Sequence, residues 1–129
     1  TMSYVHPAIV GFYQTEIERL YLPRQLHLVE SQGEAHSARS ALSARMNRPA
    51  GQVVLTALWV GDDATAVLNQ HVTALRQAGF SEIIFQLDAG ESSQAILSPA
   101  LLDSGFVPQY ILPWGGKGDV LVWMHREEE

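Results

Sequence analysis

The sequence of 129 residues contains no cysteine. This absence excludes disulfide bonds, thiolate metal sites and a cysteine nucleophile, and it fits a reducing compartment. The sequence also has no apolar run near the roughly 20 residues that a membrane-spanning helix needs, and no basic stretch leads into an apolar one near its start. We therefore expect a cytoplasmic protein that does not contact a membrane.

Basic residues are also few, with 8 Lys and Arg against 14 Asp and Glu, which gives a net charge of -6. The basic residues are scattered along the chain, and a protein of this charge repels phosphate, so we do not expect nucleic-acid binding. The hydrophobic content of 47% supports one core, and the length is too short for two. The sequence therefore predicts a single domain over residues 1–129.

Common catalytic and metal-binding motifs are missing as well. The five histidines have no spacing typical of metal ligands, and there is no Gly-x-Ser-x-Gly nucleophile elbow. They are His6, His27, His36, His71 and His125. We therefore expect no metal site.

Hydrophobic periodicity gives the order of the elements. It predicts a helix over about 7–21, an extended stretch over 24–30, and a hairpin from an alternating strand over 38–46 and an apolar strand over 52–60. Because that second strand is apolar on both faces, we expect helices or other layers to cover it from both sides.

The clearest helix lies within 61–79, where Asp62 or Asp63 can cap it and Gly79 ends it. A strand over 81–88 and a shorter helix follow, with Ser98 as the expected cap and Pro99 as the first helical residue. Two strands, over 106–114 and 119–125, complete the pattern. From residue 38 onward the order is strand, strand, helix, strand, helix, strand, strand.

The stretch "LLDSGFVPQY", residues 101–110, ends the last helix at a glycine and enters the last hairpin. With the element order around it, this stretch resembles the C-terminal half of the GNAT superfamily of N-acyltransferases, over about residues 37–126. A narrower likeness is to acyltransferase-like modules that follow kinase-type ATPase domains in some bacterial regulatory proteins. The resemblance implies an α/β fold with a mixed, largely antiparallel sheet flanked by helices and shortened at its N-terminal side.

The resemblance also locates the expected acyl-CoA site. GNAT enzymes bind the pyrophosphate through backbone N–H groups in a Gln/Arg-x-x-Gly-x-Gly/Ala loop that opens a helix. The matching loop here reads "WVGDDAT", so Gly61 is retained but Asp62 and Asp63 stand where the phosphates would lie. Each carboxylate opposes a pyrophosphate charge by about 1 kcal/mol or more. Whether or not the two aspartates simply cap the helix, we expect a poor CoA site and no cofactor, with acetyl-CoA as the alternative.

The expected general acid is missing too. Many GNAT enzymes protonate the CoA thiolate with a tyrosine four residues before the glycine of Gly-Phe, and the matching residue here is Leu101. Tyr110 and His71 remain as weak catalytic candidates. Each is also well explained as part of the core or its rim.

The loop "PWGGKGD", residues 113–119, is the one stretch suited to recognition. Trp114 offers an aromatic ring, Lys117 a charge, and the glycines allow the backbone to approach a ligand or partner. A plain glycine-rich turn is the alternative explanation. Asp88 is a further candidate, because strand ends often hold active-site residues in α/β proteins.

These observations favour a non-catalytic regulatory or protein-interaction module. The alternatives are a small-molecule N-acetyltransferase with a divergent acetyl-CoA site and a small-ligand sensor, since fold does not decide function. Compared with a full GNAT domain, little of the chain precedes Gln52, so the resemblance implies a sheet with a poorly covered edge. We therefore expect a homodimer.

Overall fold

The structure, a computed structural model, describes residues 2–20, 22, 24–28, 41–59, 63–116 and 118–126. The N-terminal elements are β1 (Met2–Val5), a 3-10 turn η1 (Pro7–Ile9), α1 (Val10–Leu20) and β2 (Gln25–Leu28). The remaining elements are β3 (Ala41–Asn47), β4 (Gln52–Trp59), α2 (Ala64–Gln77), β5 (Glu82–Asp88), α3 (Ser92–Ala95), α4 (Ser98–Asp103), β6 (Phe106–Leu112) and β7 (Val120–His125). Within these residues, no helix has the length and apolar content needed to cross a membrane.

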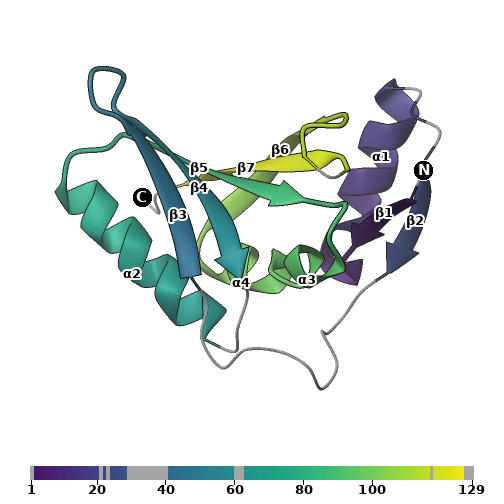
Figure 1. Cartoon of the computed structure of the whole chain (residues 1–129), viewed down its shortest axis with the longest axis horizontal. Coiled ribbons are helices and arrows are strands. Elements are labelled where there is room, and N and C mark those ends of the chain that lie inside the picture. The colour runs from purple at the N-terminus through teal and green to yellow at the C-terminus, as the bar shows by residue number, and fades with distance from the viewer. Residues whose placement is uncertain are drawn as a thin grey trace.

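The main sheet has five strands in the order β3-β4-β5-β7-β6 (Figure 1). Only β4 and β5 pair in parallel, and the other three pairs are antiparallel. The expected α/β fold with a largely antiparallel sheet flanked by helices is therefore confirmed. The predicted order of strands and helices after residue 38 holds, with the short α3 as an addition.

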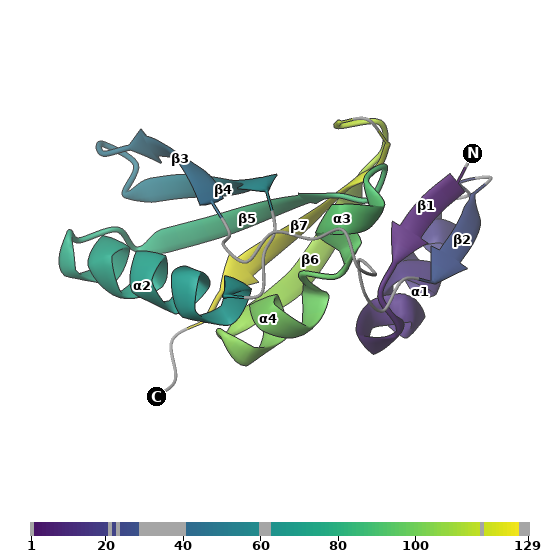
Figure 2. The same cartoon turned by 60° about the horizontal axis from the view of Figure 1, so that its bottom comes forward.

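One face of the sheet carries the hydrophobic core. Cross-strand register places Leu55 beside Phe85 and Phe85 beside Trp123, and all three side chains are fully buried. Helices α2 and α4 lie side by side against this face (Figure 2), and α2 contributes Leu68 and Leu75 to the core. The apolar side of α2 therefore points toward the sheet.

The expectation that the strand over 52–60 is covered on both sides is wrong. In β4, Val53 and Leu55 are buried, whereas Val54 and Thr56 are only half-buried. The physical reason is that no described helix lies over the second face of the sheet (Figure 2). We call this second face the open face.

Both glycines that were predicted to end a helix are confirmed. Gly79 ends α2 with φ +93°, and Gly105 follows α4 with φ +91°, both in the left-handed region that favours glycine. Ser98 does not cap α4, because Leu97 holds the N-cap position. Ser98 is instead buried, and its hydroxyl donates to the Ala95 carbonyl of the preceding α3 at 2.9 Å.

The N-terminal elements form a small unit of their own beside the main sheet (Figure 2). Strands β1 and β2 pair in parallel, and the predicted helix over 7–21 connects them as η1 and α1. The Tyr4 N–H donates to the Ala89 carbonyl at 2.7 Å, which links β1 to the turn after β5. The sequence pattern did not predict β1, which has only four residues.

Candidate functional site

Strands β4 and β5 separate at the place where the resemblance puts the acyl-CoA loop. Their ladder runs from Gln52–Glu82 to Thr56–Gln86, although β4 continues to Trp59 and β5 to Asp88. The divergence is visible in Figure 1. Gly61 and Asp62 lie outside the described residues.

Asp63 occupies the N-cap position of α2, as predicted, but it does not cap the helix in the expected way. Its side chain is half-buried and makes no capping hydrogen bond. The carboxylate still lies at the positive end of the helix dipole, where a negative charge is favourable. This is the place where the resemblance predicts a conflict with a pyrophosphate.

The two catalytic candidates do not come together. The His71 Nδ1 lies 2.9 Å from the Val67 carbonyl oxygen within α2, which packs on the core face. Tyr110 pairs with Val122, which alternates with buried Trp123, and so its side chain lies on the open face with 45% exposure. The sheet separates the two groups, so they cannot act on one substrate molecule. Leu101, at the position of the family's acid, is fully buried in the core.

A hydrogen bond to Asp88 helps to hold the loop between β6 and β7 in place. The Asp88 Oδ1 accepts from the Gly90 N–H at 2.8 Å and from the Gly118 N–H at 3.1 Å. A side chain on Gly118 would lie 2.8 Å from the Gly90 Cα, so glycine is required there. Asp88 therefore joins two turns. Lys117 lies outside the described residues.

Trp114 is the exposed part of this loop. It has a positive φ of 56° and 58% exposure. The Arg24 guanidinium lies over its ring, 5.1 Å from the ring centroid, at a distance typical of a cation–π contact. The loop thus presents one aromatic side chain whose inner side is already in contact with a cation.

Below Trp114 lies a buried polar group that sequence reasoning missed. The Asp119 carboxylate accepts from Arg24 Nε at 2.8 Å and Nη2 at 3.1 Å, and from the hydroxyls of Ser3 at 3.1 Å and Tyr13 at 3.2 Å. The Trp114 N–H approaches the same carboxylate at 3.3 Å. We call these five residues the Asp119 cluster.

Burial determines the electrostatics of this cluster. Side-chain exposure is 4% for Arg24 and zero for Asp119. Burial alone would raise the pKa of Asp119, but the hydrogen bonds from Arg24 and Trp114 outweigh it and hold that pKa below its usual value. The hydrogen bond to Asp119 raises the pKa of Arg24, and burial raises the pKa of Tyr13. The cluster therefore contains a stable buried ion pair and a neutral phenol.

This arrangement serves to hold the protein together. Its five donors occupy both carboxylate oxygens, so no acceptor site faces a substrate. The donors come from β1, α1, the residue before β2, and the loop that leads to β7. The available sequence signal was an acid directly before an apolar strand, a position where a charge needs a partner. That partner, Arg24, is 95 positions away, and the sequence alone did not connect them.

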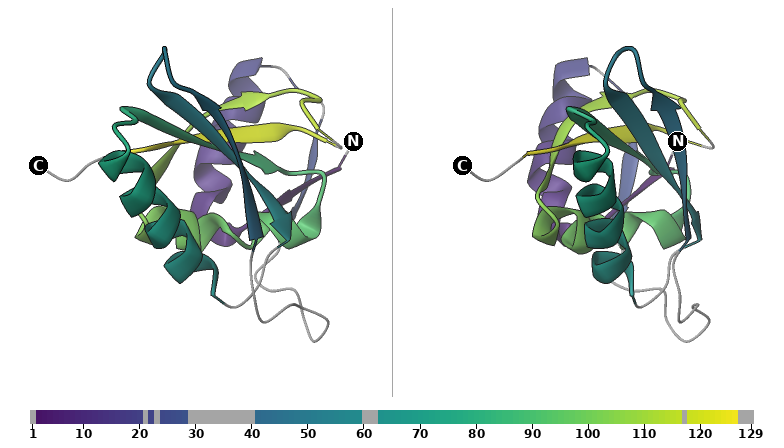
Figure 3. Two further views of the ribbon diagram at one scale, coloured as in Figure 1. Left: turned by 60° about the vertical axis from the view of Figure 1, so that its left-hand side comes forward. Right: turned by 90° about the vertical axis from the view of Figure 1, so that its left-hand side faces the viewer.

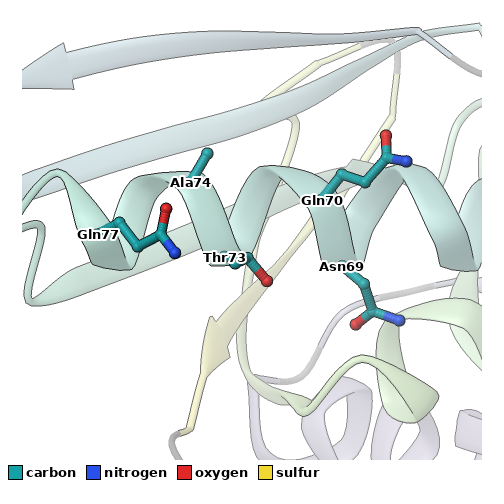
Figure 4. A pocket seen from close by; sticks show the side chains of 5 residues that line it. All are labelled: Asn69, Gln70, Thr73, Ala74 and Gln77. Carbon is teal, nitrogen blue, oxygen red and sulfur yellow. The ribbon is translucent and has the colours of Figure 1, made fainter.

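A further concave feature lies on α2. A shallow hollow on the outer side of α2 is lined by Asn69, Gln70, Thr73, Ala74 and Gln77 (Figure 4). These side chains come from one helix, and none of them is ionisable. Within the described ranges, no group of three or more His, Asp or Glu residues could hold a metal ion.

Comparison with known proteins adds no further identification. No family model, no curated protein and no solved structure matches this chain.

Proposed function

We propose that this chain is a non-catalytic regulatory or protein-interaction module with a GNAT-like scaffold, acting in the bacterial cytoplasm without a competent acyl-CoA site. The observation that carries this proposal is the state of the Asp119 cluster. Three of its members, Tyr13, Arg24 and Asp119, have clearly shifted pKa values, and the cluster is closed and saturated by internal partners. Shifted pKa values often mark active sites, but structural ion pairs produce them as well.

The scaffold part of the proposal is supported by topology. The order of strands and helices after residue 38 and the mixed, largely antiparallel sheet are the features that the resemblance implies. The Gly105-Phe106 junction between α4 and β6 is the expected one. These features concern shape and leave the chemistry open.

The interaction part is supported by the open face. Exposed apolar side chains gather along β6 and the loop after it, namely Val107, Tyr110, Leu112 and Trp114, with exposures of 40–58%. Register places Val107 beside Met124 and Tyr110 beside Val122 on the same face. Contiguous apolar surface of this kind is typical of contact surfaces for other proteins.

A thermal-shift measurement with acetyl-CoA tests the proposal. A ligand at 100 times its dissociation constant stabilises a protein by about 2.7 kcal/mol, a shift of several degrees for a domain of this size. We expect no reproducible shift at millimolar acetyl-CoA. A shift of that size would contradict the proposal and favour the small-molecule N-acetyltransferase. The separation of β4 and β5 is compatible with that alternative.

The double variant Asp62→Gly/Asp63→Gly is the matched comparison, because it removes two charges and restores backbone approach. We expect weak, salt-sensitive CoA binding in this variant if the carboxylates are what exclude the pyrophosphate. If neither protein binds, the electrostatic explanation is insufficient. If the protein is a ligand sensor, a small molecule other than CoA should raise the melting temperature of the parent chain.

A further inference from the structure

Strand β3 forms one edge of the main sheet (Figure 3). It is seven residues long, and Ala44, Arg45, Met46 and Asn47 are exposed on both of its faces. No strand of the described residues pairs with its outer side. As far as the described residues go, the outward backbone groups of β3 are therefore available to another strand.

The two edges of the sheet differ in how they are protected. Strand β6, at the other edge, contains Pro108 and an irregularity between Pro108 and Tyr110, both of which discourage strand addition. Strand β3 has one irregularity at its start, between Ala41 and Leu42, and one charged residue, Arg45, but it contains no proline, and its pairing with β4 is regular from Leu42 to Asn47. The less protected edge is therefore β3.

We propose that two copies of this chain associate through antiparallel pairing of their β3 strands about a two-fold axis at Ala44. In this register Leu42 lies opposite the partner subunit's Met46, and Ser43 lies opposite the partner subunit's Arg45. Each contact occurs twice, because a two-fold interface is self-complementary. The result is one continuous sheet with the helices of both copies on the same face.

Apolar pairing favours this register. Within the chain, Met46 pairs with Val53 and Leu42 with Ala57, which places both side chains on the core face. Met46 is nevertheless 52% exposed, because the sheet ends at β3. The partner's Leu42 would cover it, and Ala44 leaves room at the axis. Direct cross-strand pairs of this kind stabilise sheets.

Charge distinguishes this register from its neighbour. An axis at Arg45 would place two guanidinium groups directly opposite each other, which is destabilising. The axis at Ala44 moves each guanidinium opposite a serine. The hairpin also differs from the rest of the acidic chain, since residues 41–59 contain no Asp or Glu. The negative charge that would repel a second copy is therefore absent from this edge.

Single cysteines test the register directly, because the parent chain has none. Opposed residues in an antiparallel pair have Cα atoms about 4.5–5.5 Å apart, within disulfide range. We expect Ala44→Cys to form a covalent dimer on mild oxidation. In Ser43→Cys the two residues are diagonal neighbours whose Cα atoms lie about 7–8 Å apart, beyond that range, so the variant should form at least tenfold less dimer. Ala8→Cys, at an exposed position of the N-terminal unit, gives the level of random collision.

Solution mass tests the association without an added thiol. We expect light scattering of the parent chain to show the dimer mass in the micromolar range. Ala44→Lys places two charges face to face at the axis and should give the monomer mass, whereas the same substitution at exposed Ala8 should leave the dimer intact. A monomeric parent, or equal cross-linking of Ala44→Cys and Ser43→Cys, would overturn the proposal.

Discussion

At the scale of single residues, the stability of the protein depends strongly on Asp119. In Asp119→Asn the Arg24 guanidinium stays buried but loses its counter-charge, and breaking a buried ion pair in this way costs about 3–5 kcal/mol. We expect the free energy of unfolding in urea to fall by about that amount. Asp103→Asn, an exposed carboxylate at the end of α4, is the matched control and should change it by less than about 0.5 kcal/mol. Equal effects of the two variants would show that the cluster does not stabilise the fold.

The same carboxylate predicts a pH dependence. Its folded-state pKa is lowered, so its stabilising contribution is complete above the unfolded value of about 3.9 and is lost as the pH falls through the folded pKa. We expect the parent to lose stability below about pH 4 more steeply than Asp119→Asn does. Urea titrations from pH 7 to pH 3 measure this difference. Parallel curves for the two proteins would mean that Asp119 has the same pKa folded and unfolded.

At the scale of elements, the ends of α2 and α4 depend on glycine to different degrees. Gly105 and Gly79 have nearly the same φ, so alanine at either position is strained by about 1–2 kcal/mol. Only at Gly105 would the new Cβ also meet neighbours, with His125 Nε2 at 3.2 Å and the Arg126 carbonyl oxygen at 3.3 Å. Around Gly79 nothing lies within 4 Å.

We therefore expect Gly105→Ala to lower the melting temperature more than Gly79→Ala, and thermal unfolding of both variants measures the difference. If the two variants unfold at the same temperature, the contact with β7 carries no cost. The comparison separates backbone strain from crowding, because Gly79→Ala introduces only the backbone strain, whereas Gly105→Ala introduces both.

Elements set by local pattern were predictable from the sequence. The stripe of α2, the glycines after α2 and α4, and the alternation of β3 all follow from residues close in sequence. The prediction that Ser98 caps α4 was wrong, because α4 closely follows α3 and Leu97 takes the N-cap position. The sequence pattern does not indicate this arrangement. The prediction that β4 is covered on both faces was wrong, because an apolar sequence does not show whether a second layer of helices lies over the strand. Asp119 and Arg24 were missed as a pair because only the tertiary fold brings them together.

At the scale of the whole molecule, we expect the N-terminal unit and the main sheet to unfold together. Val5, Ile9 and Tyr13 belong to the same buried core as the strands, and Ser3 and Arg24 reach Asp119. Native-state hydrogen exchange should therefore give the Tyr4 amide, bonded to Ala89, the same opening free energy as the Trp123 amide. A Tyr4 amide that exchanges far faster than Trp123 would show that the unit opens separately.

The distance along the chain between Arg24 and Asp119 also matters during protein synthesis. A ribosome adds about 5–20 residues per second, so Asp119 is made on the order of 5–20 s after Arg24, which is 95 positions earlier. Throughout that interval the nascent N-terminal segment has no counter-charge for its arginine and no docking site for Tyr13. The elements up to residue 28 are thus translated well before the strand that completes their native environment, and a chaperone that holds this segment would act in that interval.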